Sequence, residues 1–280
     1  MAALEAMITV TDQQLKQAVR EHWERQPCGT RGVGADERRR FFETVERERY
    51  EVDAHIPGWA RFERGRDRDV LEIGVGAGTD FMQWVRAGAR ATGIDMTDAG
   101  IELTRERLEL EGRNATLLRG DAEQLPFSDE SFDVVYSYGV LHHTPDTPRA
   151  FAEAWRVLRP GGTLLAMIYR VPSLTGFLLW GMHCAAKLHP LTSPRQAIYE
   201  HLESPGTKAY RDDEVRSKLL PRFREVKLDT ALLAGDLLSM RASEKYQGGA
   251  AKLIWSIYPR GLIRRFGKPL GLGLLIEATK

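Results

Sequence analysis

Three carboxylates lie at or just after three short apolar segments in the middle of the chain. Glu72 stands within the first segment, Asp95 follows the second, and Asp121 follows the third. The first segment runs into the glycine-rich stretch 74–78, where missing side chains would let the backbone approach a ligand closely. Asp95 follows this stretch at about the 20-residue spacing of a carboxylate that accepts hydrogen bonds from ribose hydroxyls.

The residue types in this stretch distinguish two classes of cofactor. A dinucleotide site would have a third glycine at position 79 in the pattern G-x-G-x-x-G, but Thr79 stands there and the pattern is Glu-x-Gly-x-Gly-x-Gly. A pyrophosphate would also be repelled by Glu72, because like charges are costly when desolvated. A ligand with a ribose, an adenine and a cation but no phosphate fits better, and S-adenosylmethionine is such a ligand.

His142 and His143 are the candidates for proton transfer. One of them could be the general base that takes a proton from an acceptor hydroxyl. A metal site is not expected, since adjacent side chains point in different directions and no third ligand stands at i+4. The alternative is that the pair caps a helix or packs in the wall of a cleft, and the same alternative holds for His55.

Short apolar segments alternate with amphipathic segments from residue 69 onward. Strands are expected at 70–73, 91–94, 116–118, 132–136 and 163–169, and helices at 80–87, 99–111 and 149–158. This alternation predicts a parallel sheet with helices on both faces, doubly wound because crossovers are right-handed. Ligands bind such sheets at the carboxyl ends of the strands, where the three carboxylates would meet.

The two ends of the chain lack this alternation of short strands and helices. Helices are expected from the N-cap Thr11 to Trp23 and over residues 36–53, with a break at Pro27-Cys28-Gly29. Beyond residue 171 we expect helices at 174–188 and 212–220 and strands at 223–229 and 272–279. The expected units are an N-terminal helical lid (1–66), a cofactor-binding core (67–170), and cap helices with the final strands of the same sheet (171–280).

Composition excludes several classes of protein. The 280 residues carry a formal net charge of +1, so the chain lacks the excess of basic residues that is typical of nucleic-acid-binding proteins. Two cysteines, Cys28 and Cys184, cannot form a disulfide framework, so reduced thiols in a cytoplasmic protein are expected. No secretory leader is recognised, and the longest apolar stretch, roughly 13 residues from 174, is too short for the ~20 residues of a membrane span. The basic pair Arg264-Arg265 is expected on a solvated face.

Six segments in order carry a family resemblance: 70–78 (VLEIGVGAG), 93–95 (GID), 120–127 (GDAEQLPF), 132–136 (FDVVY), 139–143 (GVLHH) and 156–162 (RVLRPGG). Residues 70–169 resemble the core of the class I S-adenosylmethionine-dependent methyltransferases, in a branch similar to the methyltransferases of ubiquinone and menaquinone biosynthesis. The resemblance implies S-adenosyl-L-methionine as the cofactor. It also implies an α/β, doubly wound, Rossmann-like sheet of seven mostly parallel strands, with the last strand antiparallel.

The resemblance also implies roles for single residues on the adenosine side. Asp95 would bind the ribose, and Met96 would pack on the adenine. Asp121 would accept a hydrogen bond from the adenine amino group, and Ala122 would supply a backbone donor. For Met96 alone, packing in the core is an equally open alternative.

On the methionine side, the glycine stretch would lie under the cofactor with Glu72 nearby, and Ser137 and Tyr138 would lie along the methionine segment and the sulfonium. Polar residues are also common at strand ends because they stabilise turns, so this alternative stays open for Ser137 and Tyr138. The expected catalytic residues are His142 and His143, no metal ligand is expected, and the expected cofactor-binding residues are Glu72, Gly74, Gly76, Gly78, Asp95, Met96, Asp121, Ala122, Ser137 and Tyr138.

The expected reaction is in-line transfer of a methyl group to a small acceptor, without a nucleic-acid partner or stable membrane insertion. A hydrophobic acceptor, such as a quinone precursor, a polyketide or a lipid-like molecule, is indicated by apolar residues of the cap: Phe177, Leu178, Leu179, Trp180, Met182, Trp255 and Tyr258. These residues could instead seal the cap or form the interface of a homodimer. Two other functions stay open: a non-methyl displacement, such as cyclisation of the cofactor's aminobutyrate chain, and a cofactor-binding regulator without catalysis.

Overall fold

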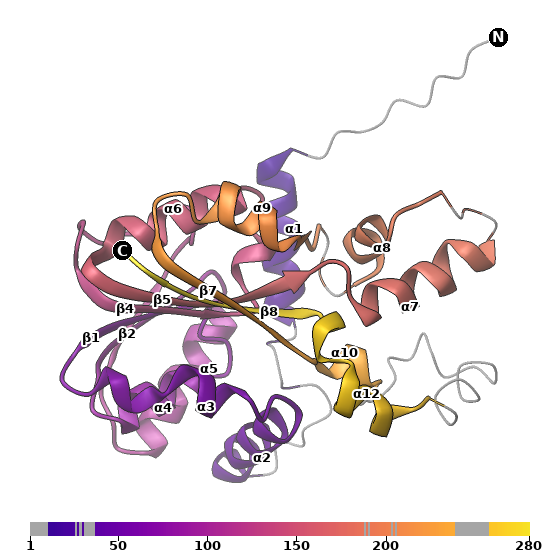
Figure 1. Cartoon of the computed structure of the whole chain (residues 1–280). Helices are drawn as coiled ribbons and strands as arrows, with labels where there is room; N and C mark the ends of the chain where they lie inside the picture. The colour runs from indigo at the N-terminus through magenta and orange to yellow at the C-terminus, as the bar shows by residue number, and fades with distance from the viewer. Residues whose placement is uncertain are drawn as a thin grey trace.

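A central sheet with helices on both faces organises the chain (Figure 1). The computed structural model describes residues 11–25, 27, 30, 37–187, 189, 191–202, 204, 206–238 and 258–280. The strands are β1 (Asp69–Ile73), β2 (Arg90–Asp95), β3 (Thr116–Arg119), β4 (Phe132–Tyr138), β5 (Leu158–Arg170), β6 (Ala209–Tyr210), β7 (Arg224–Ala231) and β8 (Gly273–Thr279). The helices are α1 (Asp12–Arg25), α2 (Arg38–Val52), α3 (Ile56–Ala60), α4 (Thr79–Arg86), α5 (Asp98–Leu110), α6 (Thr147–Val157), α7 (Leu174–His183), α8 (Pro194–His201), α9 (Asp212–Glu214), α10 (Ala234–Leu237) and α12 (Arg260–Phe266).

The strand order is β3-β2-β1-β4-β5-β8-β7, with β6 paired to the end of β5. The chain direction across the sheet reverses between β1 and β4, which is the switch point where ligands bind in such folds. Among these strands, β8 alone runs in the opposite direction to the others. The predicted doubly wound fold with an antiparallel last strand is confirmed. The predicted number of strands is one too low, because the two-residue β6 is too short to leave a periodic pattern.

The helices bury apolar stripes against the two faces of the sheet. In Figure 1, α4 and α5 lie on one face, and α6 and α9 on the other. Phe81, Met82 and Trp84 of α4 are fully buried, as are Ala150 and Phe151 of α6. Full burial of a large apolar side chain contributes about 1.5–3 kcal/mol, so packing fixes the helix that begins at the glycine stretch.

One predicted boundary is wrong in an informative way. The strand expected at 163–169 begins at Leu158, directly after α6, and includes the Pro160-Gly161-Gly162 segment. Gly161 adopts a φ of 77°, and its N–H donates to the carbonyl of Lys280 at 3.0 Å. The expected strand did not include residues 158–162, but a pairing partner from the far end of the chain extends it.

The N-terminal helix begins as predicted. The backbone N–H of Gln14 donates to Thr11 Oγ1, and the N–H of Thr11 donates to the Gln14 side chain, so each residue caps the other. The expected break falls at Cys28 and Gly29, which lie outside the described residues, as does Trp255. The division of the chain into lid, core and cap stays a prediction. No helix in the described part of the chain has the length and hydropathy needed to span a bilayer.

Candidate functional site

The glycine stretch forms a tight loop between β1 and α4. Gly74, Gly76 and Gly78 all have positive φ values, of 84°, 52° and 72°. A Cβ at position 74 would lie 2.3 Å from Val140, and one at position 78 would lie 2.9 Å from Thr104. A Cβ at position 76 would meet nothing within 4 Å. Two of the glycines are therefore required by packing, whereas the third presents its backbone to open space.

Asp95 ties this loop to the end of β2. Its Oδ2 accepts a hydrogen bond from the backbone N–H of Gly76 at 2.9 Å. Its Oδ1 accepts from the backbone N–H and the hydroxyl of Thr97 at 2.9 and 2.6 Å. A carboxylate offers about four acceptor positions, so the chain itself uses three of them. Met96, the next residue, is half-buried.

Asp121 lies beside Asp95, because the backbone N–H of Gly120 donates to the Asp95 carbonyl at 2.8 Å. The ammonium of Lys16, on α1, is 2.6 Å from Asp121 Oδ2 and 2.6 Å from Glu123 Oε2. The neighbouring Ala122 is half-buried against the core. The structure therefore places Asp95 and Asp121 at neighbouring strand ends and adds a cation from the N-terminal helix, while their predicted roles toward adenosine stay predictions.

Glu72 is buried at the other side of the loop, with 3% of its surface exposed. Its Oε2 has no hydrogen-bond partner among the described residues. Burial, with the nearby negative charge of Asp80, raises the pKa of Glu72 well above its ordinary value, although Arg49 opposes the shift. A buried carboxylate oxygen without a partner is costly, and it marks a position where a hydrogen-bond donor or a cation would be stabilised.

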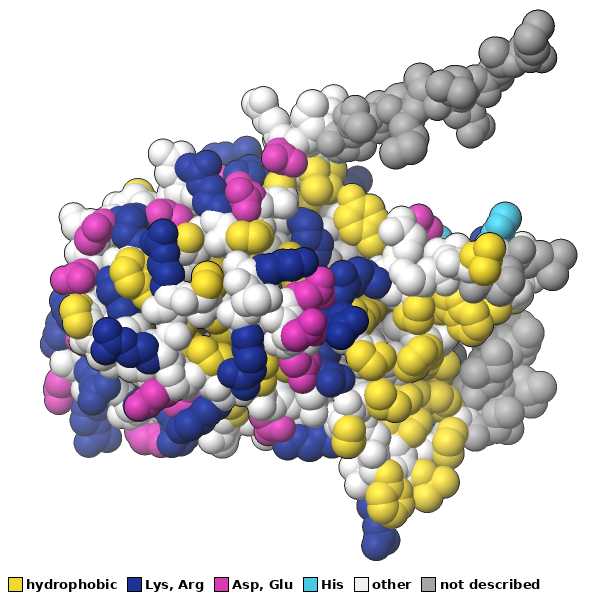
Figure 2. Space-filling model, turned by 45° about the horizontal axis from the view of Figure 1, so that its top comes forward, with side chains coloured by type: hydrophobic (Ala, Val, Ile, Leu, Met, Phe, Trp, Pro, Cys, Tyr) yellow, Lys and Arg dark blue, Asp and Glu magenta, His cyan; other side chains and the backbone are white. Residues whose placement is uncertain are grey.

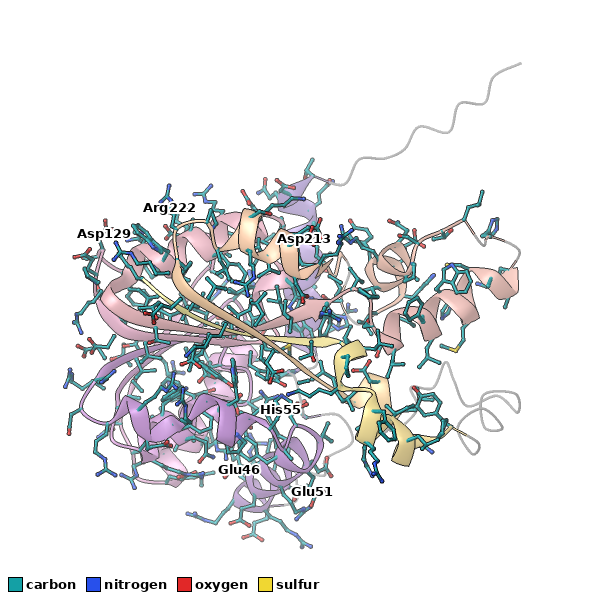
Figure 3. All side chains as sticks on the ribbon, in the orientation of Figure 1. Glu46, Glu51, His55, Asp129, Asp213 and Arg222 are labelled. Atoms are coloured by element: carbon teal, nitrogen blue, oxygen red, sulfur yellow. The ribbon has the colours of Figure 1, made fainter. Side chains whose placement is uncertain are left out.

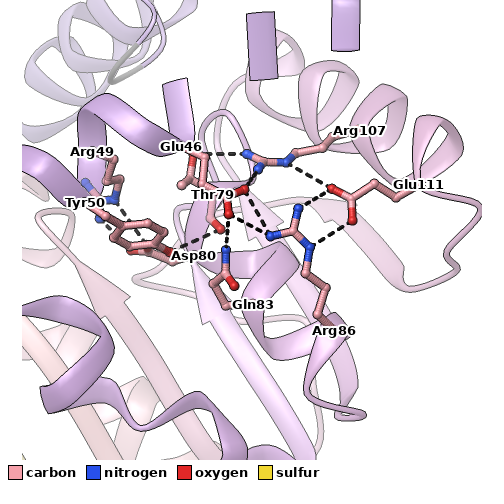
Figure 4. A network of polar contacts seen from close by, with 9 residues as sticks. All are labelled: Glu46, Arg49, Tyr50, Thr79, Asp80, Gln83, Arg86, Arg107 and Glu111. Atoms are coloured by element: carbon pink, nitrogen blue, oxygen red, sulfur yellow. Dashed lines mark hydrogen bonds and ion pairs between the residues drawn. The ribbon is translucent and has the colours of Figure 1, made fainter. Parts of the chain in front are cut away.

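Helix α2 holds the start of α4 through a polar network (Figure 4). Arg49 pairs with Asp80 at 2.5 Å, and the hydroxyls of Tyr50 and Tyr136 donate to the same carboxylate at 3.0 and 2.8 Å. These partners hold the pKa of Asp80 below its ordinary value despite its burial. One turn earlier on α2, Glu46 bonds Gln83, Arg86 and Arg107. The helix thus fixes the residues that directly follow the glycine loop.

Ser137 and Tyr138, at the end of β4, have different surroundings. The Ser137 hydroxyl is fully buried and donates to the Ile73 carbonyl at 3.0 Å, so it joins two strands. The Tyr138 hydroxyl lies 2.9 Å from His55 Nε2, and the Arg49 guanidinium lies 4.7 Å from the centre of its ring. Burial lowers the pKa of His55 to about 4, so this histidine is neutral at pH 7. His55 lies where α3 faces the final strands (Figure 3).

His142 and His143 are both buried, with 0% and 4% of their surfaces exposed. The His142 ring packs 4.1 Å from Tyr169, and neither of its nitrogens has a hydrogen-bond partner in the described structure. His143 Nδ1 lies 2.8 Å from the hydroxyl of Ser204. Burial lowers the pKa of His142 well below its ordinary value and that of His143 to about 3. Both rings are neutral at pH 7, and no group of three metal-binding side chains occurs among the described residues.

The sequence analysis missed a polar stripe on α1. Lys16 pairs with Asp121, and Arg20 lies 3.3 Å from Asp98. Glu24 accepts hydrogen bonds from the backbone N–H groups of Asp98 and Ala99 at the start of α5. The i, i+4, i+8 spacing of the three α1 residues was a visible signal, but it resembles any solvated helix face. The stripe places α1 across the carboxyl ends of β2 and β3.

Known proteins resemble the central part of this chain. Residues 71–166 match a family described as a methyltransferase domain. The chain is similar to a phthiotriol/phenolphthiotriol dimycocerosates methyltransferase of Mycobacterium tuberculosis (36% identity; 56% of this chain, 57% of the relative). It is also similar to a demethylmenaquinone methyltransferase of Clavibacter sepedonicus (30% identity; 54% and 62%). The chain matches little more than half the length of these relatives.

Solved structures share the fold. An S-adenosylmethionine-dependent methyltransferase from Archaeoglobus fulgidus has a TM-score of 0.53 at 16% identity, over 85% of this chain and 94% of its own. The [4+2]-cyclase SpnF has a TM-score of 0.54 at 16% identity, over 96% of both chains. At such identities the likeness shows the fold alone, and a fold can host several chemistries. The motifs, the sheet order and the family match together identify residues 71–166 as a methyltransferase domain of the class I S-adenosylmethionine-dependent methyltransferases.

Proposed function

We propose that this chain binds S-adenosyl-L-methionine at the carboxyl ends of β1 to β4 and transfers its methyl group to a small apolar acceptor. One observation carries the proposal: a buried, unpartnered carboxylate oxygen of Glu72 lies beside a glycine loop whose open tip, Gly76, is bonded to Asp95. The cofactor supplies, when bound, an electrophilic methyl group on a positively charged sulfur.

The residues present fit this cofactor. Glu72 offers its free oxygen to a cationic group, and that contact would lower the pKa that burial now raises. Asp95 has about one acceptor position left, so we assign it one ribose hydroxyl rather than two. Asp121 keeps its place near the adenine side while Lys16 balances its charge. Met96, Ala122 and Tyr138 keep their proposed roles, whereas the Ser137 hydroxyl already donates to the Ile73 carbonyl, so we assign Ser137 only a place beside the methionine segment.

The protein's contribution to the reaction would be positioning and exclusion of water. Tyr138 is held by His55 and Arg49, and Trp59 packs 6.2 Å from its ring. Alignment of the reacting groups by such rigid side chains can supply up to about 7–11 kcal/mol of the barrier. We keep His142 and His143 as proposed general bases, because both are neutral, but their lowered pKa values make them weak bases, so the bound acceptor would have to raise those pKa values. His55 is a further candidate for the general base, because its lowered pKa also leaves it neutral at pH 7.

The proposed acceptor site lies between Tyr138 and the cap. Trp180 and Met182 of α7 pack against a buried apolar cluster that also contacts Tyr138 and Trp59. Apolar side chains thus continue from the proposed sulfonium position to the cap, which favours a hydrophobic acceptor. Relatives named for dimycocerosates and for demethylmenaquinone support a small-molecule acceptor.

Calorimetry with S-adenosylmethionine and S-adenosylhomocysteine tests the binding step. Incubation with demethylmenaquinone as the probe acceptor, followed by mass spectrometry, tests the reaction. Formation of S-adenosylhomocysteine supports methyl transfer, whereas methylthioadenosine would show attack on the aminobutyrate chain. Absence of binding to either cofactor form would refute the proposed function. A protein that binds cofactor without turning over the probe keeps the cofactor site and rejects demethylmenaquinone as acceptor.

A further inference from the structure

Helix α12 and the 3₁₀ turn after it (Lys268–Leu270) expose large apolar side chains. Leu262 and Phe266 are 63% and 67% exposed and lie one helical turn apart, so they share one side of α12. Leu270 is 37% exposed. Figure 2 shows apolar side chains gathered over this side of the molecule, with basic side chains at its tip. Single exposed apolar residues need no explanation, but a group of this kind marks an interaction surface.

The same segment is strongly basic. Arg264 and Arg265 are exposed, and neither has a hydrogen-bond or ion-pair partner among the described residues; Arg265 lies over the Phe266 ring at 5.3 Å. The sequence from Lys245 to Ile276 holds six Lys or Arg residues and no Asp or Glu. Arginines elsewhere on the surface commonly have carboxylate partners, as Arg86 has in Glu46 and Glu111. Arg264 and Arg265 therefore have no carboxylate partner within the part of the chain that the structure describes.

We propose that α12 and the following turn dock on the surface of a membrane that contains anionic lipids. Leu262 and Phe266 would enter the boundary between headgroups and acyl chains, and Arg264 and Arg265 would contact lipid phosphates. Unpaired arginines beside exposed apolar side chains are the pattern of helices that lie in the membrane interface. Docking of this kind requires no spanning helix, in agreement with the described helices.

The docking surface lies close to the proposed acceptor site. Lys268, at the end of the segment, pairs with Asp229 of β7 at 2.8 Å, and both charges act on His55. The surface therefore adjoins the His55–Tyr138 pair, next to the proposed acceptor site. An apolar acceptor dissolved in a bilayer would then reach the site without crossing water. This last step rests on the proposed function, but the docking itself does not.

Vesicle co-sedimentation tests the docking. The full chain is mixed with vesicles of phosphatidylcholine alone, or of phosphatidylcholine with phosphatidylglycerol, at low salt and at about 1 M salt, where the Debye length falls to about 3 Å. We expect binding to the anionic vesicles at low salt only. The change R264E/R265E should weaken binding by about 30-fold or more, since each basic residue near an anionic surface contributes about fivefold. L262S/F266S should weaken it by about tenfold or more, because the apolar insertion is lost.

Matched controls separate docking from folding and from the cofactor site. R105E/R113E changes two exposed arginines of a different surface, and should leave vesicle binding intact. All variants should keep the thermal unfolding and the S-adenosylmethionine affinity of the wild type, so loss of docking is distinguishable from failure of the proposed function. Equal binding of the wild type and R264E/R265E to anionic vesicles would overturn the proposal. So would a dimer, seen by analytical ultracentrifugation, that L262S/F266S dissociates while vesicles bind neither protein.

Discussion

The change Asp95→Asn removes one charge from the centre of the candidate site while keeping the size of the side chain. In the wild type, Oδ2 accepts from Gly76 N–H and Oδ1 from two donors of Thr97. Asparagine has one accepting oxygen, and its amide nitrogen can only donate. Whichever way the amide turns, at least one of the two backbone N–H groups loses its acceptor and faces a donor.

The cost of an unpaired, partly buried N–H is about 1–3 kcal/mol. We expect the free energy of unfolding to fall by about this amount. The affinity for S-adenosylmethionine should fall by about 5- to 140-fold, because the loop under the cofactor loses its tether and the ribose loses a charged acceptor. Denaturant unfolding measures the first quantity and calorimetry the second.

Asp98→Asn is the matched control. Asp98 stands three residues further on and is half exposed, with arginine partners at 3.3 and 3.1 Å. Exposed ion pairs contribute about 0–1 kcal/mol, so this variant should keep its cofactor affinity. If Asp95→Asn bound the cofactor with wild-type affinity while Asp98→Asn did likewise, the assignment of Asp95 would be refuted.

Three further predictions follow from the buried groups. Glu72→Gln should raise the free energy of unfolding of the cofactor-free protein at pH 7 by about 1–3 kcal/mol, because the folded state raises the pKa of this carboxyl. The same change should weaken the binding of S-adenosylmethionine. Thermal unfolding with and without the cofactor measures both effects. Burial lowers the pKa values of His142 and His143, so between pH 6.5 and pH 5 protons bind to these rings in the unfolded chain but not in the folded one. The free energy of unfolding should therefore fall by about 2 kcal/mol per histidine between pH 7 and pH 5. Denaturant titrations at both pH values should show that His142→Phe removes the part of this fall that His142 causes. Trp180→Ala should raise the acceptor KM by about tenfold with little change in the cofactor Kd, and an unchanged KM would remove Trp180 from the acceptor site.

The core of the fold was predictable because its signals are local. The strands at 70–73 and 91–94 were recognised from short apolar runs, and they lie inside β1 and β2. Asp95 and Asp121 lie at the ends of neighbouring strands because parallel strands bring their carboxyl ends to one edge of the sheet. The positions of Asp95 and Asp121 after successive strands therefore predicted that they lie close together.

Other features depend on partners far away in the chain, and spacing alone could not reveal them. The pairing of Arg49 with Asp80 and of Lys16 with Asp121 joins segments that share no motif. Ser137 was expected near the cofactor, but its hydroxyl is used between strands. The burial of His142 and His143 likewise comes from packing against residues such as Tyr169 and Ser204 that stand later in the chain.

The position of β8 has a consequence for biosynthesis. This strand, the last to be translated among those described, lies between β5 and β7 and bonds to both. A nascent chain synthesised only up to residue 272 leaves one edge of β5 unpaired along most of its length and leaves β7 without its partner strand. Chaperones that shield unpaired strand edges would find their target in that intermediate, and a stalled ribosome at this point would present an aggregation-prone protein.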